Sequence, residues 1–277
     1  MKWINKKIIA LASMFYSSLF ASNEKNAIVF YGTDISYSKV QNNDYIIVQS
    51  NHIDTATPEF FNNRENMYAY VSICEISKDV IEYKKVKKEW IIAKNNEWES
   101  EVLDIKKAEY REFLFNEMIE PVMKKGFKHF FFDTLDSYQL ACKTDKERSA
   151  YEKKLILFIN EFHTRYPKSK LIINRGFEIM DDVHQSLEAV LFESYYFGLG
   201  SGEDKYRKIS DGDREWLHLH IDKIQDYGLN VIAVDYLDEN DIDKADEAIK
   251  IIRDNGMIPY ISNRSLNIYG RGQKLEL

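Results

Sequence analysis

Short apolar segments alternate with longer amphipathic ones along most of this chain. The apolar segments are rich in Val, Ile, Phe and Tyr and are too short to be helices, so the pattern predicts β-strands. The predicted strands are Ala27–Tyr31, Tyr45–Gln49, Tyr68–Cys74, His129–Asp133, Lys170–Asn174, Ala189–Glu193, Asn230–Asp235 and Met257–Ile261.

Segments between these strands carry apolar residues at the spacing of one helical face. The clearest are Tyr151–Phe162 before Pro167, Leu217–Ile224 before Gly228, and Ile242–Ile252 before Gly256. Eight β-then-α units predict an α/β fold, a (β/α)8 TIM barrel. A doubly wound open sheet is the alternative, although no glycine-rich phosphate-binding loop follows any predicted strand.

The long connection Ile76–Lys107 is the irregular part of this pattern. It contains Trp90 and Trp98. Connections of this length in a compact domain are usually functional or disordered. The two tryptophans favour an ordered loop, inserted between the third strand and its helix.

The first 21 residues have the composition of a secretory signal peptide. Met1–Lys7 carries three lysines, Ile8–Phe20 has no charged residue, and Ala21 provides a small residue for cleavage. The apolar part is too short to span a bilayer, although an uncleaved anchor is an alternative. We therefore expect a periplasmic or secreted protein that has no membrane association after cleavage, with one domain over residues 22–277.

The charge balance argues against a nucleic-acid partner. The formal net charge is −7, and loss of the three lysines with the signal peptide makes it −10. Nucleic-acid binding requires clustered basic residues, whereas an acidic protein suits a cationic ligand. Cys74 and Cys142 are the two cysteines, and a disulfide between them and two free thiols both remain open.

Polar residues follow the predicted strands at the end where a TIM barrel carries its active site. Cleavage of a glycosidic bond needs two carboxyl groups, one as acid and one as nucleophile or base, and we select Asp133 and Glu193. Neighbouring strand ends and aromatic positions supply the predicted substrate-binding residues. They are Glu75, Asp136, Tyr138, Asn174, Arg175, Tyr195, Tyr196, Asp235, Tyr236 and Tyr260. No zinc or calcium motif is present in the sequence, so we predict neither a metal nor another cofactor.

Four sequence strings resemble glycoside hydrolase family 114, which contains endo-α-1,4-polygalactosaminidases and is related to the hydrolase domain of Pel exopolysaccharide systems. The strings are Tyr70–Glu75, Phe131–Tyr138, Asn174–Glu178 and Phe192–Tyr195. The resemblance spans about Ile28–Tyr269. It implies a TIM barrel that cleaves an α-1,4-linked polymer containing galactosamine, in a biofilm or exopolysaccharide context.

The resemblance also places the acidic residues of the family on Asp133 and Glu193, with Glu75 at a third acidic position. Cys74 stands where relatives tend to have glycine. A deacetylase or export partner is a possibility that the resemblance raises.

Several alternatives remain open at this stage. The barrel could bind a polysaccharide without cleaving it and assist export, or it could hydrolyse a different glycan. Retaining, inverting and substrate-assisted mechanisms are all compatible with two carboxyl groups, and the sequence does not assign which of them is the acid.

Overall fold

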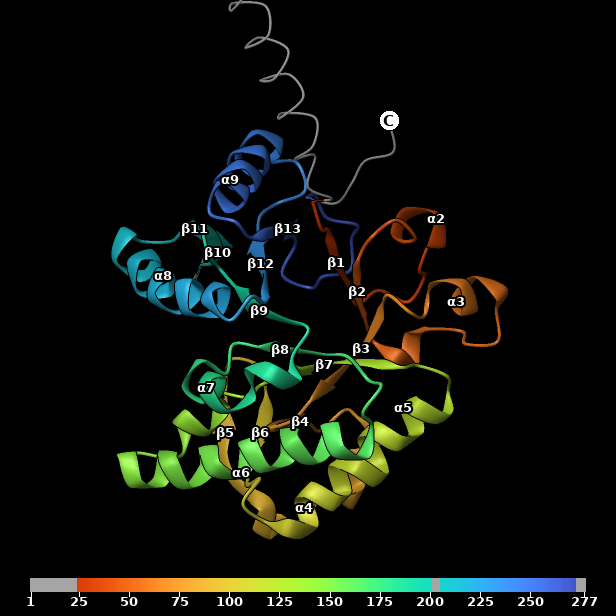
Figure 1. The fold of residues 1–277 in the computed structure, drawn as a ribbon, viewed down its shortest axis with the longest axis vertical. Coiled ribbons are helices and arrows are strands. Elements are labelled where there is room, and N and C mark those ends of the chain that lie inside the picture. Colours follow the sequence, from red (N-terminus) through yellow and green to blue (C-terminus); the bar gives the residue numbers. More distant parts are fainter. Residues whose placement is uncertain (1–23, 201–204, 273–277) are drawn as a thin grey trace, which may run out of the picture.

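A computed structural model describes residues 24–200 and 205–272, and the predicted signal peptide lies outside this part. An eight-stranded parallel sheet has the order β1-β2-β3-β7-β8-β9-β12-β13. β13 returns to lie beside β1, so the sheet is nearly closed into a barrel (Figure 1). Its strands are β1 Ala27–Phe30, β2 Tyr45–Val48, β3 Met67–Ser72, β7 His129–Asp133, β8 Leu171–Asn174, β9 Ala189–Glu193, β12 Asn230–Tyr236 and β13 Ile258–Ser262.

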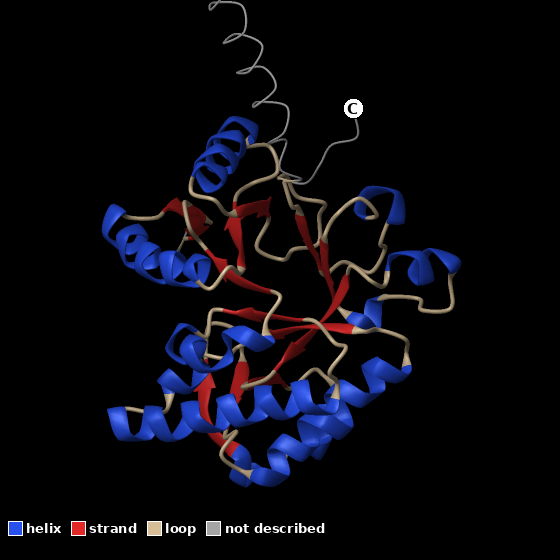
Figure 2. Ribbon diagram, viewed as in Figure 1, coloured by secondary structure: helices blue, strands red, loops and turns tan. Residues whose placement is uncertain are grey.

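Helices surround this sheet (Figure 2). The α-helices are α2 Tyr37–Val40, α3 Pro58–Asn63, α4 Ala108–Phe113, α5 Glu120–Lys124, α6 Asp145–Arg165, α7 Met180–Val183, α8 Asp211–Asp226 and α9 Ile242–Asp254. A π-helical segment, η4 Leu114–Ile119, joins α4 to α5. Short 3-10 helices are η1 Ser50–His52, η2 Ile81–Lys85, η3 Lys88–Trp90, η5 Ser137–Leu140, η6 Phe177–Ile179 and η7 His184–Ser186. The predicted TIM-barrel fold is confirmed, and the eight predicted strands are its eight barrel strands.

Strand β7 shows how side-chain alternation places a polar residue at the mouth of the barrel. Phe130 and Phe132 point outward and pack against Phe162 of α6, with ring centroids 5.5 and 4.8 Å apart. Phe131 lies on the opposite face, near Tyr70 of β3. Because side chains alternate along a strand, Asp133 shares the inward face with Phe131. The same pattern that buries the aromatic core therefore directs Asp133 into the barrel.

The segment predicted as an elaborated loop is ordered and largely strand. It forms a three-stranded antiparallel sheet, β4-β6-β5, from β4 Glu75–Ser77, β5 Ile91–Asn95 and β6 Ser100–Leu103. Trp90 is buried against Tyr110 and Phe113, whereas Trp98 is half exposed in the turn between β5 and β6. One tryptophan anchors this small sheet to the helical layer, and the other remains accessible.

Three neighbouring barrel strands end in the same unusual way. Thr134, Arg175 and Ser194 directly follow β7, β8 and β9, and their φ angles are 66°, 55° and 66°. Left-handed backbone is uncommon for residues other than glycine, and for a β-branched residue such as Thr134 it is a genuine outlier. Each turns the chain sharply immediately after a polar strand-end residue.

The two cysteines are both buried and both free, so of the two open alternatives the structure shows two thiols. Cys74 packs in the core, where the nearby Tyr151 hydroxyl donates to the Leu103 carbonyl. No helix within the described part of the chain is long and apolar enough to cross a lipid bilayer.

Candidate active site

A cleft of about 1030 Å³ opens at the carboxyl ends of the barrel strands. It gathers residues from strand ends that lie far apart in the sequence, as a TIM-barrel active site does. Of the residues predicted from the sequence, those that line it are Glu75, Asp133, Asp136, Asn174, Arg175, Glu193 and Tyr236.

Asp133 is held by several hydrogen-bond donors. Its Oδ1 accepts hydrogen bonds from the backbone N–H of Thr134 at 2.7 Å and from Nδ2 of Asn174 at 2.8 Å. The Tyr70 side chain also hydrogen-bonds it. Burial raises the pKa of Asp133 above its usual value, while these hydrogen bonds act in the opposite direction. The donors favour the ionised form of this carboxyl group.

Glu193 has fewer hydrogen-bond donors around its carboxyl group than Asp133. The Tyr236 hydroxyl donates a hydrogen bond to its Oε1. Burial, followed by the negative charge of Asp133, raises the pKa of Glu193 to about 7. With a single described donor against three for Asp133, Glu193 is the carboxyl group that keeps a proton more readily.

Two tyrosines that we did not select from the sequence also line this cleft. Tyr31 follows β1 and Tyr70 lies in β3, and their rings are in edge-to-face contact at 5.3 Å. Asp133 and Glu193 both contribute to raising the pKa of each hydroxyl, after burial, which is the largest cause. Tyr70 could have been found from the sequence, because the alternation of side chains along β3 places it on the inward face of the barrel.

Glu75 lies in the cleft wall at the start of β4, and the residue is only 6% exposed. Asn95 Nδ2 donates to Oε1 at 3.0 Å, and the hydroxyls of Ser100 and Ser137 donate to Oε2 and Oε1. Three neutral donors therefore compensate for its burial. They come from both ends of the Trp98 turn and from the segment that follows β7.

Arg175 and Asp136 form an ion pair at the rim. Their closest atoms are 3.7 Å apart, and both side chains are 37% exposed. Arg175 lowers the pKa of Glu193 and Asp136 raises it, each less than burial does. At this exposure the pair contributes little to stability, but its charges border the two buried carboxyl groups.

Asp235 lies outside the cleft although it is near a strand end. Side-chain alternation in β12 sends Val234 and Tyr236 into the cleft and Asp235 to the opposite face. There it is fully buried, and its carboxylate accepts backbone N–H groups of Tyr195, Tyr196 and Phe197 at 2.6, 2.9 and 2.7 Å. Burial raises the pKa of Asp235 to about 7, against these three hydrogen bonds. Asp235 thus anchors the segment that follows Glu193.

The Asp235→Asn variant is expected to unfold about 4–8 °C below the wild type, as estimated from a loss of about 2 kcal/mol. The Asn amide nitrogen cannot accept, so at least one of the three buried N–H groups loses its partner. Thermal unfolding followed by circular dichroism measures the shift. Glu239→Gln, at an exposed position in the loop after β12, is the matched control. An Asp235→Asn protein as stable as this control would contradict the anchoring role.

Tyr195 and Tyr196 are turned away from the cleft by the same anchoring. The Tyr195 hydroxyl is 2.6 Å from Nε2 of His218, and the Tyr196 hydroxyl donates to Glu247 at 2.6 Å. Both partners lie on helices outside the barrel, so these two tyrosines fasten the β9 connection to the helical layer.

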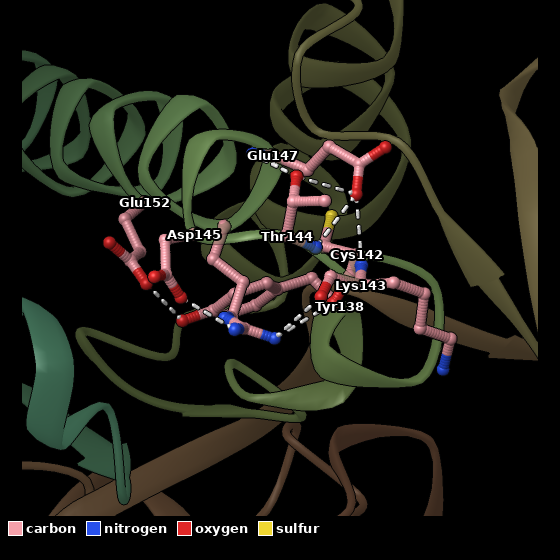
Figure 3. A network of polar contacts seen from close by, with 8 residues as sticks. Tyr138, Cys142, Lys143, Thr144, Asp145, Glu147 and Glu152 are labelled. Carbon is pink, nitrogen blue, oxygen red and sulfur yellow. Dashed lines mark hydrogen bonds and ion pairs between the residues drawn. The ribbon is translucent and has the colours of Figure 1, made fainter.

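Tyr138 and Tyr260 also do not line the cleft. The Tyr138 ring stacks on Tyr151 at 4.8 Å, and its hydroxyl donates to Glu152 of α6 at 2.7 Å (Figure 3). The Tyr260 hydroxyl accepts the backbone N–H of Gly270 at 3.0 Å. Both side chains are buried and stabilise the surroundings of the site.

Among residues 24–200 and 205–272, no group of three or more His, Cys, Asp or Glu side chains is arranged to hold a metal ion. The chemistry that this arrangement can perform on its own is proton transfer and nucleophilic attack by two carboxyl groups whose environments separate their pKa values.

Comparisons with known proteins agree with this geometry. The model of glycoside-hydrolase family GH114 matches residues 24–275. The glycoside hydrolase domain of PelA from Pseudomonas aeruginosa is 26% identical with a TM-score of 0.80, over 89% of this chain and 98% of that one. Aspergillus fumigatus Ega3, in a complex with galactosamine, is 13% identical with a TM-score of 0.68, over 89% and 93% of the two chains. A search of curated protein sequences gave no match.

The family match extends over nearly the whole described chain, and the barrel superposes on a glycoside hydrolase domain over almost all of that domain. The similarity to Ega3 supports the fold. The chain therefore belongs to glycoside-hydrolase family GH114 and is a glycosidase.

Proposed function

We propose that the protein cleaves an α-1,4-linked polysaccharide containing galactosamine, with Glu193 as the general acid and Asp133 as the nucleophile or general base. The observation that carries this assignment is the unequal hydrogen bonding of two carboxyl groups in one cleft. Asp133 accepts three donors that favour its ionised form, whereas Glu193 has a pKa raised to about 7. One protonated and one ionised carboxyl group at neutral pH is what glycosidic cleavage requires.

The charge of the cleft supports a cationic polymer as substrate. Acidic side chains in its wall outnumber basic ones. The acidic residues are Glu75, Asp79, Glu82, Glu97, Glu117, Asp133, Asp136 and Glu193, and the basic ones are Lys125, Arg175 and Arg264. A field of this sign attracts the free amines of a partly deacetylated galactosaminan. The complex of Ega3 with galactosamine is consistent with the same sugar.

The composition of residues 1–21 supports export of this enzyme to the periplasm or beyond the cell. An extracellular polysaccharide would be met there. If its amines are exposed by a deacetylase, that enzyme would act before this one.

Release of reducing ends tests the proposed activity. Residues 22–277 are expected to cleave partly deacetylated α-1,4-galactosaminan and to leave amylose, an α-1,4-glucan without amines, intact. Binding of galactosaminan without cleavage would favour the non-catalytic barrel, although the family match speaks for an enzyme. Cleavage of amylose would show that a different glycan is the substrate.

A further inference from the structure

Trp98 occupies an unusual position for a large aromatic residue. It lies in the turn between β5 and β6, residues 96–99, is 50% exposed, and lines the same cleft as Asp133 and Glu193. Within a cleft, an exposed indole presents a flat apolar face that a ligand can cover. The proposed function accounts for the carboxyl groups of the cleft but not for this side chain.

Arg264 holds the indole from another wall of the cleft. Its guanidinium carbon lies 4.6 Å from the centre of the Trp98 ring, a cation–π contact. Arg264 belongs to the loop after β13, whereas Trp98 belongs to the insertion after β3. In the sheet, β1 and β2 separate these two strands. The contact therefore spans two strand ends, where Tyr31 and Gln49 line the cleft.

Both loops are held in place by hydrogen bonds. Glu75 binds Asn95 and Ser100, which flank the Trp98 turn on either side. In the facing loop, the Leu266 carbonyl accepts the backbone N–H of Tyr31 at 2.7 Å. The backbone on both sides of the indole is therefore held in place, and the contact with Arg264 favours one orientation of its ring.

We propose that Trp98 is a sugar-binding platform on which one ring of the polysaccharide stacks through its apolar C–H face, and that Glu75 is the positioning residue that fixes it. A galactose-configured ring has an axial hydroxyl at C4, which leaves the hydrogens of C3, C4 and C5 on one face. That face complements the indole surface that Arg264 leaves uncovered. The platform rests on the proposed function, since it binds the same polymer that Asp133 and Glu193 cleave.

Kinetics of Trp98→Ala on galactosaminan test this platform. KM is expected to rise about tenfold, which corresponds to about 1.4 kcal/mol, with kcat changed less than about twofold. Trp98→Phe, which keeps an aromatic face, should recover part of the loss. Trp216→Ala is the matched control, because Trp216 is 48% exposed but lies on α8 outside the cleft lining.

Fluorescence supplies a readout that is independent of turnover. The Glu193→Gln variant should bind galactosamine oligosaccharides with a change in tryptophan emission, and the double variant with Trp98→Phe should lose that change. An unchanged emission difference, or an unchanged KM in Trp98→Ala while the wild type cleaves the polymer, overturns the platform alone. Absence of both cleavage and binding by the wild type overturns the proposed function and the platform with it.

A double-mutant cycle tests the role of Glu75. Glu75→Gln keeps the size of the side chain but replaces one acceptor oxygen by an amide. If Glu75 acts through Trp98, Glu75→Gln raises KM in the wild type and adds little in the Trp98→Ala background. Additive effects on KM would contradict the positioning role, since a general loss of stability is the same in both backgrounds.

Discussion

Glu193→Gln is expected to lower kcat on galactosaminan by about 10²–10⁴-fold, the usual contribution of a general acid. The amide cannot donate its proton to a leaving oxygen as a carboxylic acid does. The replacement is close to isosteric, and its Oε1 can still accept the hydrogen bond from Tyr236. Loss of activity should therefore come without loss of fold. Glu178→Gln, at an exposed carboxyl group near the end of β8, is the control.

The dependence of kcat/KM on pH provides a second test of the role of Glu193. Because the pKa of Glu193 is raised to about 7, the acid keeps its proton below that value and loses it above. In the wild type, kcat/KM should therefore fall as pH rises through about 7, and the residual activity of Glu193→Gln should show no such fall. An aryl oligosaccharide with a dinitrophenolate leaving group needs no acid, so it should restore much of the rate. A variant that such a substrate does not rescue would rule out Glu193 as the acid.

Asp133→Asn is expected to lower kcat by about 10⁴-fold, as the loss of a nucleophile or its base does. Both described N–H donors, from Thr134 and Asn174, bind Oδ1, so an asparagine in the same orientation retains both hydrogen bonds. Removing the charge also relieves its repulsion of Glu193. The pKa of Asp133 is raised in the folded state, so the free energy of unfolding of the wild type falls as pH rises through this raised pKa. The variant has no carboxyl group at this position and should not show that fall.

Steady-state kinetics and thermal unfolding above neutral pH check both parts of this expectation. The dinitrophenyl substrate should not rescue Asp133→Asn, in contrast to the variant at Glu193, because bond formation rather than leaving-group departure is impaired. Asp182→Asn, exposed on α7, is the control. Near-normal activity of Asp133→Asn would remove the role given to Asp133. Rescue by the activated leaving group would instead make Asp133 the general acid.

The barrel and its two central carboxyl groups could be predicted from the sequence because both depend on local patterns. A run such as His-Phe-Phe-Phe-Asp gives the strand, its two faces and the residue at its end. Asp235 shows where position alone was insufficient, since it is near a strand end but on the outward face. Applying the alternation of β12 to it would have separated it from Tyr236.

Other parts of the site depend on contacts that no local pattern encodes. The partners of Glu75 are 20 to 62 residues away in the chain, and they meet only because the inserted sheet and the segment after β7 come together in the cleft wall. Tyr138 is the last residue of one of the four strings that resemble the family, yet a 3-10 turn directs its hydroxyl to Glu152 of α6 (Figure 3). Side-chain alternation along the strands and the turns that follow them decided which predicted residues reached the cleft.

The left-handed residues after β7, β8 and β9 limit where this enzyme can be made more thermostable. Such backbone costs of the order of 1–3 kcal/mol at each position, so the rim stores conformational strain that the rest of the barrel offsets. Glycine substitutions at Thr134 or Ser194 would release part of it, but at Thr134 glycine would also remove the hydroxyl that accepts the backbone N–H of Cys74 at 3.0 Å. They would also loosen the joints that aim Asp133 and Glu193. Stabilising substitutions for this enzyme are better sought in the helical layer, away from these three turns.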